Sequence, residues 1–372
     1  MRIALFSIFV LHAISCFSQQ NEAQELAEKK ASNKISNYNF LQQTLNYAAL
    51  SYICPTGLDR GSPKGWYILS ADIIPQFVIG GEWTRFTAHL TARYQVRILH
   101  NNKVAGDSSA PVRTPSFMPG ATVYYSLHRT PPEAKSLNYV SLSFFHHSNG
   151  QDGNELLENG DLNLYNGNFS TNYVEPAYNF RRRYFDDIIM AKKVCEDAKP
   201  NYLDVYGRIG YEIHFNTSDE LKSSYGTQRL NFLLGFIRVR NYCDYVKGKQ
   251  INLSDTTIQV GDSYYRERYR TIFSATLIGG SRDRGLSDLK HRLNVDLSFH
   301  YRIPSSPNTS AFFGFGYMGS DIYNIYYEQN YFYVRAGIAL GFFVAPNIVG
   351  SKRTESRNDK YIEKIPQQST NR

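Results

Sequence analysis

The 372-residue sequence predicts an all-β protein, a transmembrane antiparallel β-barrel of about 12 strands. Long stretches such as Phe86–Ile98 alternate between apolar and polar side chains, which is the period of a strand with two different faces. The chain has 29 Tyr and 23 Phe, yet its mean hydropathy is negative. No apolar run long enough for a spanning helix follows the first 20 residues. Half-polar strands that cross a bilayer account for all three observations.

The N-terminus predicts export. Arg2 precedes an apolar stretch from Ile3 to Ile14 and then small residues, so residues 1–18 are interpreted as a secretory signal peptide. An anchor in which Cys16 carries a lipid is the weaker alternative, because AIS is a poor lead-in to a modified cysteine. A polar segment, 19–40, separates the signal peptide from the barrel, which is predicted over 41–345.

The alternation is clearest in FTAHLTARYQVRI, where Phe86, Leu90 and Tyr94 share one face while charged and polar residues take the other. The same pattern recurs in LDVYGRIGYEIHF and LNVDLSFHYRI. Sandwich strands are usually about 5 or 6 residues long, whereas a tilted strand needs about 9–11 residues to cross the hydrocarbon layer. Closure into a barrel also removes the unpaired sheet edges that lipid could not satisfy.

Twelve strands are predicted: 44–53, 66–79, 84–99, 121–130, 137–149, 170–181, 201–215, 229–241, 265–279, 291–303, 311–318 and 331–344. An even number places both termini in the periplasm, so 80–83 becomes a short periplasmic turn and 100–120 an external loop. The connections 182–200 and 242–264 are long for periplasmic turns, and the sequence offers no account of them.

The net charge of +8 does not indicate a nucleic-acid partner, because no aromatic-and-basic recognition motif accompanies it. Charges such as Arg181–Arg183 are interpreted as lumen and rim residues.

After export the chain keeps Cys54, Cys195 and Cys243, whose spacing resembles no metal site. A disulfide is one outcome, and none of the three is interpreted as catalytic. Residues 346–372 are interpreted as a polar C-terminal tail.

The stretch VSLSFFHHSNGQDG, residues 140–153, contains the candidate catalytic residues. Val140, Leu142 and Phe144 must face lipid, and His146 and Ser148 continue that face. An imidazole two residues from a serine on one face of a strand can take its proton, and a nucleophile exposed to the bilayer meets acyl chains. His147 and Asn149 point into the lumen and are interpreted as structural. The alternative is that all these residues are ordinary polar side chains at a strand end.

A third group should orient the imidazole. In NFSTNYVEPAYNF on the next strand, Asn172 shares its parity with Val174 and Tyr178, so its side chain is expected to face lipid beside His146. An uncharged amide avoids placing a carboxylate next to hydrocarbon.

These residues resemble the outer-membrane phospholipase A family, whose HxSNG motif is matched by His146, Ser148, Asn149 and Gly150. APVRTPSFMPG is similar to the family's SPFRxTNYxP, with Pro111, Arg113 and Pro119 at matching spacing in a loop, and LNYAALSY, residues 45–52, resembles its opening strand. The likeness covers about residues 45–180. It implies that Ser148 is the nucleophile, His146 the base and Asn172 the orienting residue, with the backbone amides of Ser148 and Gly150 binding the oxyanion.

The resemblance also implies calcium and a homodimer when active. The family's calcium ligands fall on Ala110, with Ser109 beside it, on the carbonyl of Gln151 and on Asn168, so the site departs from the family pattern. Hard cations accept neutral oxygens of this kind. The acidic residues between Ser148 and Asn172, namely Asp152, Glu155, Glu158 and Asp161, either supply ligands or belong to a solvated loop; we favour the loop.

The sequence therefore predicts a (lyso)phospholipid acyl hydrolase of the phospholipase A1/A2 type in a bacterial outer membrane. A lipid A deacylase is a second enzyme hypothesis, although those barrels are shorter and lack the PVRTPSFMP-like loop. A non-catalytic porin or adhesin is the third, because one barrel fold hosts many functions.

Overall fold

The computed structural model describes residues 25–33, 37, 40–60, 67–80, 85–99, 113–129, 134–186, 200–244, 250–253, 256–259, 262–280, 288–303, 306, 308–341 and 343–344. The predicted signal peptide, the polar tail and Ala110 lie outside these residues.

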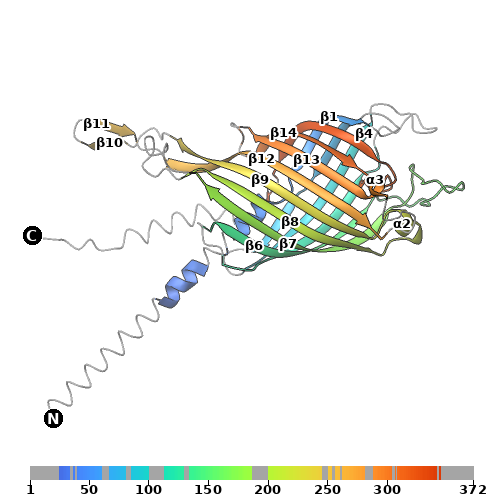
Figure 1. Cartoon of the computed structure of the whole chain (residues 1–372), viewed down its shortest axis with the longest axis horizontal. Helices are drawn as coiled ribbons and strands as arrows, with labels where there is room; N and C mark the ends of the chain where they lie inside the picture. Colours follow the sequence, from blue (N-terminus) through green and yellow to red (C-terminus); the bar gives the residue numbers. More distant parts are fainter. Residues whose placement is uncertain are drawn as a thin grey trace, which may run out of the picture.

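The chain folds into a closed antiparallel barrel of 12 strands (Figure 1). Its wall is formed by β1 (Ser51–Arg60), β2 (Tyr67–Ile73) continued by β3 (Gln76–Gly80), β4 (Phe86–Leu99), β5 (Ser116–Ser126), β6 (Ser136–Ser148), β7 (Ser170–Phe185), β8 (Tyr202–Phe215), β9 (Gln228–Asp244), β12 (Asp262–Gly279), β13 (Leu293–Arg302), β14 (Thr309–Met318) and β15 (Tyr331–Leu340). The ring closes where β1 pairs with β15. A two-residue strand, β16 (Phe343–Val344), adds to β3 in parallel outside the ring.

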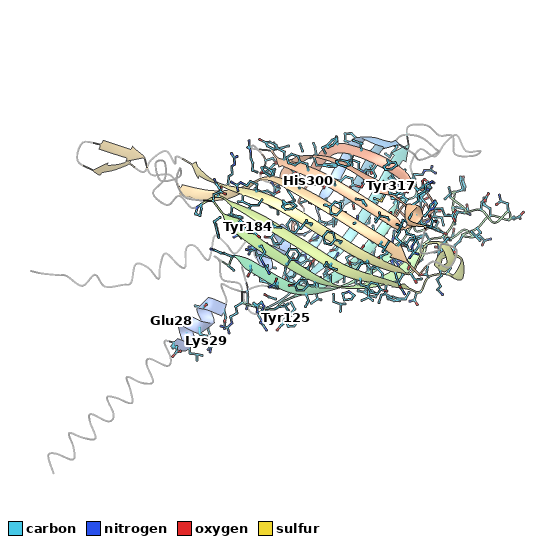
Figure 2. The ribbon with its side chains drawn as sticks, in the orientation of Figure 1. Glu28, Lys29, Tyr125, Tyr184, His300 and Tyr317 are labelled. Atoms are coloured by element: carbon cyan, nitrogen blue, oxygen red, sulfur yellow. The ribbon has the colours of Figure 1, made fainter. Side chains whose placement is uncertain are left out.

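The predicted alternation is confirmed. Phe86, Leu90 and Tyr94 of β4 are exposed on the outer wall, whereas Thr87 and His89 are buried inside. Tyrosines border the apolar wall: Figure 2 shows Tyr125 and Tyr184 toward the end near the 25–33 helix, and Tyr317 toward the other end. An apolar band with aromatic borders is typical of an outer-membrane barrel. Within the part of the chain that the structure describes, no helix is both long and apolar enough to cross a membrane.

The first predicted strand, 44–53, is wrong. Residues 40–46 are helical and β1 begins only at Ser51. Leu41 and Leu45 lie one helical turn apart and pack together on Val78, inside the barrel near the end that carries the 25–33 helix. Tyr47 donates to Asp204 Oδ2 at 2.9 Å and stacks on Tyr206. This segment therefore plugs that end of the lumen.

The opposite end of the barrel is capped by loops that include α2 (Asp219–Ser224) and α3 (Leu289–Arg292) (Figure 1). The cap has its own core, made by Phe169, Leu221, Tyr225, Tyr323, Ile325, Tyr326 and Tyr327. Arg97 and Asp321 form a buried ion pair beneath it at 2.5 Å. The barrel is thus filled at both ends by packed side chains.

One further prediction is corrected, and one connection that the sequence left without an account is explained. Ser116–Gly120 was expected in an external loop, but these residues begin β5 and lie next to β6. The long connection after β9 arises because β9 and β12 continue past their neighbours: β8 starts opposite Val239, so Arg240–Asp244 pair with β12 alone. A small hairpin of β10 (Gln250–Leu253) and β11 (Thr256–Gln259) lies between them.

We predict that the purified protein conducts no steady ion current in planar bilayers, because the helical segment at one end and the tyrosine-rich cap at the other fill the lumen. Single-channel recording checks this. A stable open conductance typical of porins would contradict the packing described here.

Candidate functional site

Strands β6 and β7 bring His146 and Asn172 directly opposite each other. His146 Nδ1 lies 2.9 Å from Asn172 Oδ1. Because an amide oxygen can only accept, the hydrogen belongs to Nδ1, and Nε2 is left as the basic nitrogen. Both side chains are half-buried on the outer wall, on the same face as the exposed Val140, Leu142 and Phe144.

Ser148 is the last residue of β6 and lies on the same face as His146, opposite Phe117 of β5 and Ser170 of β7. In the described residues its hydroxyl makes no hydrogen bond, so the serine and histidine are neighbours on the strand without being bonded. Such bonds often form only when substrate is bound. The arrangement offers an oriented imidazole and a half-buried hydroxyl on one surface.

Gly150 gives the chain its turn out of β6. Its φ of +67° is a left-handed conformation that a residue with a side chain adopts only under strain. Within the described part of the chain, the Gly150 N–H donates no hydrogen bond, and the ring of Phe117 packs against its Cα, 3.7 Å from where a Cβ would lie. The Gly150 N–H can therefore donate a hydrogen bond to a further acceptor.

His147 and Asn149 point into the lumen, as predicted. His147 Nε2 bonds to Ser116 Oγ at 2.6 Å, and its ring meets Phe169 edge-on. Asn149 donates to Gly167 O at 2.8 Å and accepts from the backbone N–H of Phe169 and of Gln151. These contacts fix the wall and the loop root behind Ser148.

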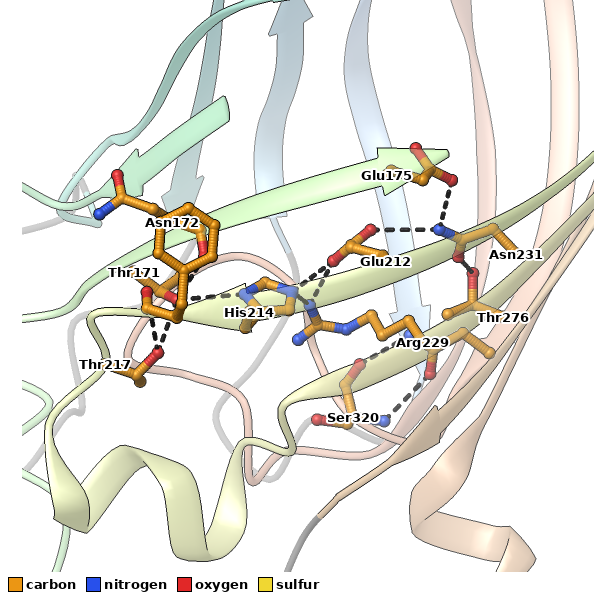
Figure 3. Close-up of polar contacts among 12 residues, drawn as sticks. Thr171, Asn172, Glu175, Glu212, His214, Thr217, Arg229, Asn231, Thr276 and Ser320 are labelled. Atoms are coloured by element: carbon orange, nitrogen blue, oxygen red, sulfur yellow. Dashed lines mark hydrogen bonds and ion pairs between the residues drawn. The ribbon is translucent and has the colours of Figure 1, made fainter. Parts of the chain in front are cut away.

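A second set of catalytic residue types lies inside the barrel. Thr171 Oγ1 is 3.1 Å from His214 Nδ1, and His214 Nε2 bonds to Glu212, which also accepts from Arg229 (Figure 3). Thr171 is 0% exposed and His214 6% exposed, and the lumen is filled at both ends. No lipid reaches this hydroxyl, so we interpret the network as structural.

The network supports the outer site through β7. Asn231 joins Glu175 and Glu212, and Thr276 donates to Asn231 Oδ1 at 2.8 Å, so strands β7, β8, β9 and β12 are tied together (Figure 3). Thr171 and Asn172 are consecutive in β7. The hydrogen bonds that Thr171 makes inside the barrel therefore also fix the backbone from which Asn172 faces outward. Buried hydrogen-bond networks of this kind tie neighbouring strands together, although Arg229 Nε and Nη2 have no hydrogen-bond partner among the described residues.

The predicted calcium ligands are only partly described. Ala110 lies outside the described residues, while Gln151 and Asn168 are on adjacent segments of one loop, since Asn168 N donates to Gly153 O at 2.8 Å. Among the described residues, no three His, Cys, Asp or Glu side chains gather where they could hold a metal ion. Asp152, Glu158 and Asp161 are exposed, and Glu155 accepts from Ser218 at 2.5 Å.

Sequence reasoning missed Ser116 as the partner of His147, although Ser116 lies inside the quoted PVRTPSFMPG motif. It also missed Tyr326, which contacts both segments that flank the site. The sequence gives no signal for Tyr326, because its contacts are made only through the folded cap. Cys54 is buried and its thiol donates to Ala336 O at 3.1 Å, away from this site.

No family model matches the chain, and no curated protein matches it. Among solved structures, the chain is similar in fold to the outer membrane phospholipase A from Escherichia coli, with 12% identity, a TM-score of 0.44, and coverage of 81% of this chain and 96% of that one. An active-site asparagine-to-alanine mutant of that protein gives the same identity and TM-score, with coverage of 83% and 98%. A likeness of this size says nothing about activity, so the case for a function rests on this chain's own side chains.

We predict that Asn149→Ala lowers the free energy of unfolding by about 2–3 kcal/mol, because three hydrogen bonds are lost and their backbone partners stay buried. Urea unfolding in lipid vesicles measures the change. Asn159→Ala, at an exposed loop position, is the control and should shift it by less than about 0.5 kcal/mol. Equal effects of the two substitutions would contradict the anchoring role.

Proposed function

We propose that the protein is a bacterial outer-membrane phospholipase A that hydrolyses acyl ester bonds of (lyso)phospholipids. The observation that supports this best is the 2.9 Å contact between His146 and Asn172 on the outer wall, with Ser148 on the same face. The match of His146, Ser148 and Gly150 to the family's HxSNG motif supports the same proposal independently of that distance.

The depth of the site favours a glycerolipid ester. Ser148 ends β6, beyond the exposed Leu142 and Phe144, so it lies where the apolar band gives way to the outer loops. The ester groups of a phospholipid lie at this same boundary, between the acyl chains and the headgroup. An acyl chain could therefore lie along the wall while its ester carbonyl meets the hydroxyl.

In the first step, Ser148 Oγ attacks the ester carbonyl carbon and its proton passes to His146 Nε2. Asn172 Oδ1 holds the Nδ1 hydrogen and so keeps the imidazole turned toward the serine. The carbonyl oxygen becomes an oxyanion, which the backbone N–H groups of Ser148 and Gly150 would stabilise. When the intermediate collapses, His146 gives the proton to the departing lysolipid oxygen, and the acyl group remains on Ser148.

In the second step, a water molecule attacks the acyl-serine carbonyl and gives its proton to His146. The ester bond to Ser148 breaks, the serine oxygen regains the proton, and a free fatty acid leaves. The barrel wall here gives access from the lipid side for the substrate and from the outer loops for water. These steps are the same for any headgroup and for either acyl position.

We further propose calcium as a cofactor and a homodimer as the active form. The carbonyl of Gln151 and the side chain of Asn168 are neutral oxygen donors on adjacent backbone segments, and their chemistry suits a hard cation. When bound, the ion would supply positive charge near the oxyanion-binding amides. The exposed apolar wall beside the site offers a surface on which a second copy could complete a groove for an acyl chain.

The other two hypotheses fit less well. A lipid A deacylase of similar motif is expected to be a shorter barrel, whereas this wall has 12 strands. A porin needs an open lumen, whereas the described lumen is filled by the 40–46 helix and the cap. An adhesin would have no use for an oriented imidazole on the lipid face.

We predict that Ser148→Ala lowers fatty acid release from phosphatidylethanolamine by about 10³-fold or more, because the nucleophile is removed. Release from detergent-solubilised wild type and variant measures this. His147→Gln changes the neighbouring lumen-facing histidine but keeps a side chain that can hydrogen-bond to Ser116, so its activity should stay within about 3-fold of wild type. Equal release by wild type and Ser148→Ala would end the proposal.

We predict that a calcium chelator lowers activity and that added calcium restores it. Gln151→Ala should need the same calcium concentration as wild type, because Gln151 would bind through its backbone carbonyl. Asn168→Ala should need about 10-fold more, because it loses a side-chain ligand. Activity that ignores both chelator and Asn168→Ala would contradict the calcium assignment.

A further inference from the structure

Tyr326 lies in the loop between β14 and β15, far along the sequence from the candidate site. Its side chain is 3% exposed within the tyrosine-rich cap. Its hydroxyl accepts from Arg113 Nη1 at 3.2 Å and donates to Leu164 O at 3.2 Å. One buried hydroxyl thus joins the segment before β5 to the loop between β6 and β7.

The contact of Tyr326 with Arg113 connects it to the segment beside Ser148. The Arg113 guanidinium also lies over the Tyr326 ring at 4.8 Å, and Asn324 of the same loop donates to Thr114 O at 3.1 Å. Three residues after Arg113, Ser116 bonds to His147, and the next residue, Phe117, pairs with Ser148. The position of residues 113–117 therefore sets the β5 side of the site.

The contact of Tyr326 with Leu164 connects it to the segment beside Gly150. From Leu164 the chain runs to Gly167 and Phe169, which both bond to the side chain of Asn149. Asn149 lies between Ser148 and Gly150. The Tyr326 hydroxyl therefore bridges two segments that converge, from opposite sides, on the tripeptide proposed to bind the oxyanion.

Asn324 adds an observation of its own. Its φ of +111° lies in the region that residues with side chains rarely adopt, and its side chain is buried at 0% exposed. A strained backbone persists when its surroundings hold it, and strain of this kind gathers at functional sites. The contacts of Asn324 with Thr114 O and of Tyr326 with Arg113 hold the loop in this conformation.

We propose that Tyr326 is a positioning residue for the reaction: its hydroxyl holds residues 113–117 and 164–169 together and so fixes the backbone N–H groups of Ser148 and Gly150. This inference rests on the proposed function. Tyr326 itself touches neither substrate nor reacting atoms. Burial raises the pKa of Tyr326, so the hydroxyl keeps its proton at neutral and mildly alkaline pH and can donate to Leu164.

Tyr326→Phe tests the proposal, because it removes both hydrogen bonds and keeps the ring and its packing. We expect kcat for phosphatidylethanolamine hydrolysis to fall about 10-fold to 100-fold while KM stays within about 2-fold, since misplaced groups cost turnover more than binding. The midpoint of thermal unfolding should fall by a few degrees at most, as expected for the loss of two buried hydrogen bonds in a barrel of this size. Amide hydrogen exchange in peptides covering residues 113–117 and 148–151 should become faster.

Tyr327→Phe is the matched control. Tyr327 belongs to the same buried core, but its hydroxyl accepts from Ser224 Oγ at 3.1 Å, next to α2. Wild-type kcat and exchange are expected for this variant. If Tyr326→Phe behaves like Tyr327→Phe in both kcat and exchange, the positioning role is overturned. An inactive wild type would instead refute the proposed function, and the exchange measurement would still decide whether Tyr326 holds the two segments.

Discussion

The alternation of side chains across a closed sheet is the constraint on which the rest of this molecule depends. Successive residues of a strand point to opposite faces, so His146 and His147 lie on opposite sides of one wall. The first meets lipid and bonds to Asn172, and the second meets the lumen and bonds to Ser116. A shift of one residue in register would exchange them and remove the outward pair.

The two faces do different work for the site. The outer face offers apolar surface, an oriented imidazole and a hydroxyl. The inner face offers no access, but it fixes the backbone from which those groups project, through Asn149, Thr171 and the Glu212 network. These buried bonds support the wall from the lumen side. The 40–46 helical segment at one end and the cap at the other pack against the same wall that carries the candidate site.

The sequence predicts features that are set by local periodicity. The strand faces and the outward parity of His146, Ser148 and Asn172 follow from the two-residue period alone. Pairing of His146 with Asn172 is less local, because it depends on how the loop between them sets the register of β6 and β7. The predicted strand 44–53 begins too early, since the spacing of Leu41 and Leu45 also fits a helix, and the packing of both on Val78 goes with a helix over residues 40–46. Residues 116–120 were expected in the 100–120 loop, but they begin β5, where a barrel strand accommodates Pro119. Tyr326 could not be predicted, because the β14–β15 loop reaches Arg113 and Leu164 only in the folded cap.

Covalent labelling tests the central claim most directly. A lipid-like sulfonyl fluoride, added to the intact barrel in phospholipid vesicles, should modify one residue, and mass spectrometry of the digested protein locates it. The account predicts a single adduct on Ser148 that disappears in His146→Ala. An adduct on the lumen-facing Ser116, on any other serine, or the same labelling in His146→Ala would contradict it.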